Sequence, residues 1–133
     1  NGNKYNPAAG DQGSSYGDSY ANDDIIGIAM DLDNMKLYFS KNGTFQNSGD
    51  PTSGATGTGA IDITVAVAST IDQAYFVCQG SAGASTSRFD WNFGSPMYSI
   101  SSGNSDANGY GNFEFSVPSG YYAWNSKNLS EFG

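Results

Sequence analysis

Two short runs of alternating residues, separated by a turn, constrain the fold more than any other feature of this sequence. In residues 24–33, large apolar side chains alternate with Gly, Ala and Asp. Residues 36–41 alternate again, and the Asp-Asn pair at 33–34 between the runs favours a turn. Because successive side chains of a strand point to opposite faces, this pattern predicts an antiparallel hairpin. Its buried face is expected to carry Ile26, Ile28, Met30 and Leu32.

The rest of the chain is expected to be strands and loops. Gly, Ser and Asn fill 50 of the 133 positions and Leu only three, a composition that disfavours helices. The pair Asn42-Gly43 predicts a second turn, while residues 1–22 and 46–59 have the composition of loops. Residues 125–133 are expected to form at most one helical turn. Apolar or alternating runs predict further strands at residues 61–67, 74–79, 88–94, 113–117 and 121–124.

These strands predict the fold class. About seven short strands at hairpin spacing are typical of an all-β domain built as an antiparallel β-sandwich, here with long Gly/Ser/Asn-rich loops. The length of 133 residues fits a single domain, residues 1–133. Trp91 and Trp124 lie in alternating patterns and are expected in the core, and Cys78, within an apolar run, is expected to be a buried, inert thiol.

Charge and composition exclude several classes of function. The net charge of −8 repels phosphate backbones and anionic lipids, so we expect no nucleic-acid partner. No apolar run approaches the length of about 20 residues that spans a bilayer, so no membrane insertion is expected. The chain has no His and one Cys, which removes the usual zinc sites, His-dependent catalytic triads and an internal disulfide.

Four motifs in order give the sequence a family resemblance. They are SYGDSY at residues 15–20, DDIIGIAMDLD at 23–33, LYFSKNG at 37–43 and WNFG at 91–94. Together they resemble the SPRY domain. The resemblance implies a concanavalin A-like sandwich of two antiparallel sheets, of jelly-roll type, that works as a binding module through its loops and has no catalytic activity. Residues 108–113 and 118–125 also resemble the tail of SPRY-like proteins of bacteriophages and marine bacteria.

The sequence departs from the family before Tyr16. Members of the family begin with several strands ahead of the Tyr-Gly motif, and residues 1–15 do not resemble them. We therefore expect this chain to be the C-terminal part of a longer polypeptide. The missing strands are expected from the remainder of that polypeptide or from other virion proteins, in an oligomeric or multivalent assembly, because half a sandwich exposes sheet edges and part of its core.

Candidate ligand-binding residues lie in the Gly- and Asn-rich loops. Tyr provides rigid contact area and Asn or Asp adaptable hydrogen bonds, the combination used by many binding loops. Sugars stack on aromatic rings and form hydrogen bonds with such side chains, so a host surface polysaccharide is one expected ligand. The alternative is that these rings point inward and anchor the loops. The candidates are Tyr5, Asn6, Tyr16, Tyr20, Asn104, Asp106, Asn108 and Tyr110.

Metal binding and catalysis are weaker interpretations. Residues 104–109 place oxygen side chains at the first, third and fifth positions and Gly at the sixth, as a calcium loop begins, but the twelfth position is Phe115 instead of Glu. An ordinary polar turn is the expectation, and calcium is the alternative; no other cofactor is expected. The carboxylates lie mostly beside turn residues, where Asp bonds its own backbone, so we expect no enzyme.

The function expected from these observations is a non-enzymatic binding module of a bacteriophage structural protein, such as a tail fibre, head fibre or decoration protein. It is expected at the virion surface or outside the cell, recognising a host surface glycan or a neighbouring virion protein. Two alternatives remain open. One is a purely structural virion subunit that mediates assembly, and the other is a secreted bacterial adhesin or carbohydrate-binding domain.

Overall fold

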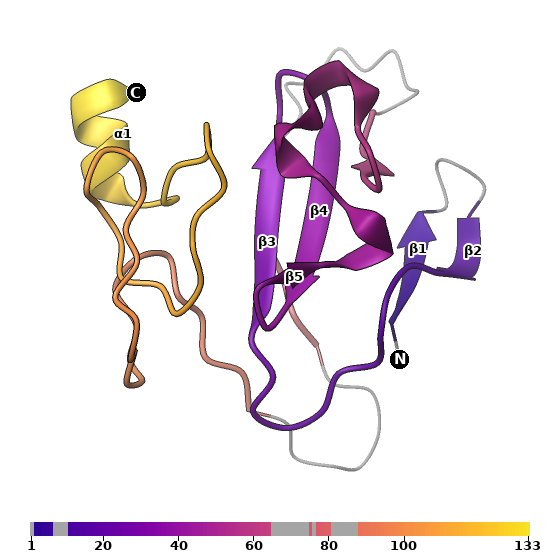
Figure 1. The fold of residues 1–133 in the computed structure, drawn as a ribbon, viewed down its shortest axis with the longest axis horizontal. Coiled ribbons are helices and arrows are strands. Elements are labelled where there is room, and N and C mark those ends of the chain that lie inside the picture. The colour runs from indigo at the N-terminus through magenta and orange to yellow at the C-terminus, as the bar shows by residue number, and fades with distance from the viewer. Residues whose placement is uncertain (1, 7–10, 65–74, 76, 81–87) are drawn as a thin grey trace.

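The computed structural model describes residues 2–6, 11–64, 75, 77–80 and 88–133, and within them the regular structure is mainly antiparallel β (Figure 1). A two-stranded sheet joins β1 and β2, and a second sheet has the order β3-β4-β5, with β6 also paired to β4. The strands are β1 (Asn3–Asn6), β2 (Asp11–Ser15), β3 (Ile26–Asp31), β4 (Lys36–Lys41), β5 (Thr44–Phe45) and β6 (Ile61–Asp62). The helices are the 3₁₀ helices η2 (Gln46–Ser48) and η3 (Pro51–Thr56) and the α-helix α1 (Ser126–Phe132). None of the described helices is long and apolar enough to cross a membrane.

The predicted central hairpin is confirmed. β3 and β4 pair antiparallel from Ile26↔Lys41 to Asp31↔Lys36. The turn between them is held by the Asp31 carboxylate, which accepts hydrogen bonds from the Asn34 backbone N (2.9 Å) and side-chain Nδ2 (2.8 Å). These bonds hold the pKa of Asp31 below its usual value.

The predicted turn at Asn42-Gly43 is also confirmed. Asn42 has φ 48° and Gly43 has φ 83°, so both residues adopt the left-handed region that a tight two-residue hairpin turn requires. The turn pairs Lys41 with Thr44 and so adds β5 to the sheet.

The face of the hairpin that is buried differs from the prediction. Ile26 and Ile28 are 43% and 45% exposed, whereas Tyr38 on the opposite face is fully buried. The reason is the segment 46–59, which folds back over the Tyr38 face instead of remaining a loop at the edge. The Tyr38 hydroxyl lies 3.3 Å from Ser53 Oγ, and the Tyr38 ring meets Phe45 edge-on, with centroids 6.4 Å apart and an interplanar angle of 85°.

The N-terminal residues form a hairpin where a surface loop was expected. β1 and β2 pair antiparallel from Asn3↔Ser15 to Asn6↔Asp11. The two strands consist mainly of polar residues and therefore lack the apolar alternation from which strands are predicted. They pair through their backbones. Figure 1 shows this hairpin on the opposite side of the β3–β5 sheet from the C-terminal segment.

Later strand predictions hold only in part. Residues 61–62 form β6, which pairs Leu37 with Ile61 and Lys36 with Asp62; Ile63 and Thr64 lie beyond the strand, and residues 65–67 lie outside the described residues. In the predicted strand 74–79, the described residues 75 and 77–79 are not in a strand, and residues 74 and 76 lie outside the described part. Cys78 is exposed there and not buried, because no described strand carries it into a core.

The C-terminal segment, residues 88–133, is the largest departure from the predicted strands. Residues 88–94, 113–117 and 121–124 are not strands; only an isolated bridge joins Asn104 to Phe113. Trp91 and Trp124, expected in the core, are 41% and 58% exposed, because the segments that carry them are not strands of a packed sheet; both rings contact Phe93. The tail forms the seven-residue helix α1, longer than the single turn expected. Figure 1 shows this segment, orange to yellow, beside β3.

Candidate functional site

The Asp106 carboxylate organises the C-terminal segment. Oδ1 accepts hydrogen bonds from the backbone N–H groups of Asn108 (3.0 Å) and Tyr110 (2.9 Å), which closes the turn 106–110. Oδ2 accepts from the Ala123 N–H (2.8 Å) and from Asn128 Nδ2 (2.7 Å). Asp106 and Asn128 are both buried. The Asp106 side chain therefore joins the turn to Ala123, just before α1, and to Asn128 within α1. These residues lie 17 and 22 positions further along the chain.

These hydrogen bonds decide the charge state of Asp106. Burial alone raises the pKa of this carboxyl, but the bonds from Ala123, Asn128, Tyr110 and Asn108 outweigh burial and hold the pKa below 3.8. The carboxylate is thus ionised at neutral pH, and its four lone-pair sites face N–H donors. The Asp106 oxygens are thus used within the protein, and among the described residues no group of three or more His, Cys, Asp or Glu side chains could hold a metal ion.

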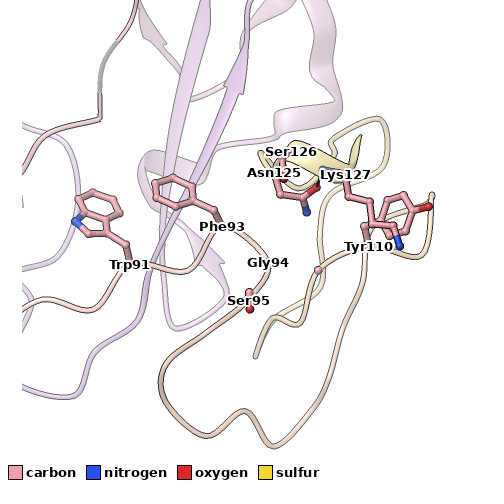
Figure 2. Close-up of a pocket in the computed structure, with 9 residues that line it drawn as sticks. Trp91, Phe93, Gly94, Ser95, Tyr110, Asn125, Ser126 and Lys127 are labelled. Atoms are coloured by element: carbon pink, nitrogen blue, oxygen red, sulfur yellow. Dashed lines mark hydrogen bonds between the residues drawn. The ribbon is translucent and has the colours of Figure 1, made fainter. Parts of the chain in front are cut away.

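An open pocket of about 520 Å³ lies beside the Asp106 turn (Figure 2). Its walls come from three segments that the Asp106 network and the N-terminus of α1 bring together. Figure 2 shows Trp91 and Phe93 on one side of the pocket and Tyr110 with Lys127 on the other. The lining residues are Trp91, Phe93, Gly94, Ser95, Tyr110, Gly111, Asn125, Ser126 and Lys127.

Aromatic rings form two sides of the pocket. The rings of Trp91 and Phe93 are nearly parallel, with an interplanar angle of 7° and centroids 5.8 Å apart. The edge of Trp124 supports Phe93 from outside the pocket lining, at 5.9 Å and 88°. Gly94 adopts φ 114°, and a side chain there would meet Asn125 Nδ2 at 2.9 Å and Gly111 Cα at 3.1 Å. Gly94 therefore keeps the space between the aromatic walls open.

A cation and a hydrogen bond fix the Tyr110 wall. Lys127 Nζ lies 5.1 Å from the centre of the Tyr110 ring, in cation–π distance. The Tyr110 hydroxyl donates a hydrogen bond of 2.6 Å to Glu131 Oε2. This bond raises the pKa of Tyr110, so the phenol stays protonated and neutral under ordinary conditions.

Asn125 contributes a hydrogen-bond donor to the pocket. Its Oδ1 caps α1 by accepting from the backbone N–H groups of Lys127 (3.1 Å) and Asn128 (2.9 Å). Because the oxygen is fixed by these donors, the amide nitrogen Nδ2 must occupy the other branch, next to Gly94. Nδ2 donates no hydrogen bond to another described residue and is available to a ligand.

The structure separates the predicted site residues into two groups. Asp106, Asn108 and Tyr110 lie together, but only Tyr110 lines the pocket; Asp106 shapes the turn, and Asn108 Nδ2 donates to Asn128 Oδ1 at 2.8 Å. Asn104 lies at the other end of this loop, where its Nδ2 donates to the Glu114 carbonyl at 3.0 Å. The turn residues are thus mainly a scaffold for the pocket.

The N-terminal candidates lie elsewhere in the fold. Tyr16 is buried as a loop anchor: its ring meets Phe39 edge-on at 6.1 Å, and its hydroxyl accepts a bond of 3.4 Å from the Phe39 N–H. Tyr5 and Asn6 lie in β1, and Tyr5 and Tyr20 are exposed. None of these four residues lines the pocket at Tyr110.

Eight of the nine lining residues were not among the predicted site residues, and the exception is Tyr110. Trp91 was expected in the core and Phe93 in the strand 88–94, while Asn125 and Lys127 belong to the tail 125–133, where at most one helical turn was expected. The sequence signal for Trp91 and Phe93 is an aromatic pair in an Asn- and Gly-rich stretch, WNFG, which is also the composition of a binding loop. The convergence of this pair with Asn125 and Lys127 depends on contacts between distant segments and is visible only in the fold.

Comparison with known proteins gives no relative: no protein-family model, curated protein or solved structure matches this chain. The resemblance to the SPRY domain therefore stays a prediction, and the pocket is the structural basis of the function proposed below.

Proposed function

We propose that this chain is a non-enzymatic binding module that takes a glycan into the pocket formed by Trp91, Phe93 and Tyr110. The observation that carries the proposal is the convergence of three aromatic side chains from two separate segments, Trp91 and Phe93 from one and Tyr110 from the other, around one open pocket that polar donors also line. Apolar and aromatic walls with a few placed polar groups are the general chemistry of ligand pockets. Aromatic faces pack against the C–H faces of a sugar, while Asn125 Nδ2 and the hydroxyls of Ser95 and Ser126 can bond its oxygens.

The pocket lining favours binding over turnover. It contains no Asp, Glu, His or Cys, and Lys127 is its only titratable side chain apart from Tyr110. Glycoside hydrolysis ordinarily uses a pair of carboxyl groups, and nucleophilic catalysis requires a base beside the nucleophile. A ligand in this pocket would contact groups that orient it, but neither a pair of carboxyl groups nor a nucleophile with an adjacent base among the lining residues.

The SPRY resemblance supports a place for this module on a bacteriophage virion, as part of a tail fibre, head fibre or decoration protein. Many copies on one particle would offset weak binding at each pocket, because linked sites bind with avidity. A secreted bacterial adhesin or carbohydrate-binding domain would use the same pocket chemistry. Identification of the proteins that co-purify with the chain from its source separates these two settings.

Retention on immobilised polysaccharides and host cells tests the proposed function. The chain is displayed in many copies on a particle, beside Trp91→Ala and a control, Tyr5→Ala, which removes an exposed ring from β1. Loss of the Trp91 ring should weaken retention about tenfold, equivalent to about 1.4 kcal/mol, and Tyr5→Ala should not. Absence of retention by the folded multivalent chain, or equal loss in both variants, contradicts the proposal.

A second candidate function, an assembly subunit, is favoured by the apolar face of β3 and β4. Ile26 and Ile28 are exposed on this face, and β3 is an edge strand among the described residues. Such a face and edge favour a covering β-segment, which in a SPRY-type sandwich belongs to a second sheet. We propose that a segment of a neighbouring virion protein covers it.

Incorporation into the particle tests this second candidate. Ile28→Asp places a charge on the face and should prevent incorporation, while Ile28→Val keeps the face apolar and should assemble normally. Glycan retention should be unchanged in both variants, because Ile28 lies outside the pocket. Equal incorporation of the two variants would show that the face is not used in assembly. Mass spectrometry of cross-linked particles would show whether the segment on this face comes from a neighbouring protein or from the same polypeptide.

A further inference from the structure

The pocket at Tyr110 differs in charge from the rest of the chain. The sequence has 13 acidic and 5 basic side chains, yet the pocket lining contains one cation, Lys127, and no carboxylate. A second hollow of about 570 Å³, between the β3–β4 turn and η3, has the opposite character: Asp31 and Asp33 line it, with no Lys or Arg. The two hollows would therefore prefer ligands of different charge.

The charge of Lys127 is available to a ligand. Lys36, Lys41 and Arg88 each form an ion pair with an Asp, at 2.9, 3.2 and 3.1 Å. Lys127 forms no ion pair with an acid in the described part of the chain; its Nζ lies over the Tyr110 ring. A ring face attracts an ammonium group and limits its positions, but it carries no net charge and leaves the positive charge uncompensated.

The other polar groups of the pocket add donors. Asn125 directs its Nδ2 toward the pocket because its Oδ1 is occupied by two N–H groups of α1. Ser95 and Ser126 add hydroxyls to the lining. An anion at this position would meet an ammonium, an amide donor and hydroxyl donors without an opposing carboxylate in the lining, which is the chemistry of charge-assisted hydrogen bonding.

We propose that the pocket selects sugars that carry an anionic group, a uronate carboxylate or a sulfate ester. This inference rests on the proposed glycan-binding function. The sugar ring packs on the Trp91–Phe93 side, and its anionic group faces Lys127 on the opposite side of the pocket (Figure 2).

The net charge of −8 does not prevent this selection. At physiological ionic strength the Debye length is about 8 Å, so exposed acids beyond that distance act weakly on a ligand in the pocket. Two acids bond Tyr110 from outside the lining: Glu131 through the hydroxyl, and Asp106 through the backbone N–H. The Asp106 carboxylate is bonded by four N–H groups. Lys127, over the centre of the Tyr110 ring, is the only charged side chain in the lining, and its charge favours an anion there.

Matched pairs of polysaccharides test the inference. One pair is agarose and carrageenan, a neutral and a sulfated galactan; the other is polygalacturonate with and without methyl esterification. We expect at least about fivefold tighter binding to the charged member of a pair at 0.05 M salt, with the advantage shrinking toward 0.5 M salt as the ion pair is screened. The pair that shows the preference distinguishes sulfate from carboxylate.

Variants locate the preference within the chain. Lys127→Gln should lower affinity for the charged polysaccharide to that of its neutral partner, and Lys127→Arg should keep the preference. Lys4→Gln removes the same unit charge from β1 and should change nothing. Equal binding of charged and neutral polysaccharides, or equal effects of Lys4→Gln and Lys127→Gln, overturns this inference and leaves the glycan pocket standing. Failure to bind any polysaccharide overturns the proposed function and this inference with it.

Discussion

The β3–β5 sheet and the turn around Asp106 are both ordered, but different forces hold them. In the sheet, the fully buried Tyr38 ring packs under the segment 46–59 and against Phe45. In the C-terminal segment, the central buried group is the ionised Asp106, which accepts four hydrogen bonds. The first region is stabilised mainly by removing an aromatic ring from water, and the second mainly by satisfying a buried charge.

This difference explains where the exposed aromatic rings lie. A region whose order comes from a hydrogen-bonded carboxylate does not need its aromatic side chains as a core. Trp91, Phe93 and Trp124 therefore remain exposed while the backbone around them stays fixed. In the C-terminal segment, the hydrogen bonds of Asp106 hold the backbone, so the exposed aromatic rings can contact a ligand. In the sheet, the Tyr38 ring is buried and stabilises the fold.

Removal of the Tyr38 ring should have the largest effect. Tyr38→Ala deletes the only fully buried large side chain among the described residues and should lower the free energy of unfolding by about 3–5 kcal/mol. Urea denaturation measures this loss. Tyr38→Phe is the control: it removes only the contact of 3.3 Å with Ser53 Oγ and should cost about 1 kcal/mol or less. Similar losses for the two variants would contradict a role based on ring burial.

Asp106→Asn should cost less and act locally. The amide has one acceptor oxygen, and its NH₂ group would face N–H donors at Ala123 and Asn128. We expect a loss of about 2–3 kcal/mol, because charge-assisted bonds are broken and donors are left unpaired. Hydrogen exchange should show faster exchange at Tyr110 and Ala123 and unchanged protection in β3 and β4. Uniform loss of protection would contradict two separately stabilised regions.

Acid should reveal the same difference. The pKa of Asp106 is lowered in the folded chain, so its ionisation contributes stability above the ordinary value of 3.8 that is lost as the pH falls through the folded pKa. Asp31 and Asp50 also have lowered pKa values, so the sheet weakens in acid as well. The decisive measurement is tryptophan fluorescence during acid titration. In the native chain, we expect the fluorescence of Trp91 and Trp124 to change as the pH falls below 3.8. In Asp106→Asn, the same altered fluorescence should already be present at neutral pH.

The sequence predicts the central hairpin well because its determinants are local. Alternation over residues 36–41 and the pair Asn42-Gly43 fix β4 and the turn to β5 without reference to the rest of the chain. The buried face could not be predicted, since it depends on the segment 46–59 folding back over Tyr38. β1 and β2 were missed because backbone pairing between polar strands leaves no apolar pattern.

The candidate site shows a similar division. Tyr110 was predicted as a ligand-binding residue from loop composition, which is a local property, and the structure places it in the lining of the pocket. Trp91 was assigned to the core because the alternating pattern around it predicts a strand. Such a pattern does not show whether a second layer of the fold covers that strand. Lys127 and Asn125 were missed because the hydrogen bonds that bring α1 to the turn connect Asp106 to residues 17 and 22 positions away.

Tyr121 connects the two regions, and its removal should have the smallest effect. The Tyr121 hydroxyl donates a bond of 3.0 Å to the Pro51 carbonyl in η3, so it joins the C-terminal segment to the cover of the sheet. Tyr121→Phe should lower the free energy of unfolding at pH 7 by about 1 kcal/mol, as measured by urea denaturation. Tyr122→Phe, at an exposed position, is the matched control and should be neutral.

The raised pKa of Tyr121 predicts how the stability of the fold changes at high pH. Burial, followed by the nearby Asp31, Tyr38 and Asp50, raises the pKa of Tyr121 to about 12 from 10.0. A raised pKa means that the protonated hydroxyl stabilises the fold below pH 10, and this contribution is lost as the pH rises from 10 toward 12. In Tyr121→Phe the stability should fall less steeply over that range than in the native chain. Parallel curves for the two proteins would show that folding does not raise the pKa of Tyr121.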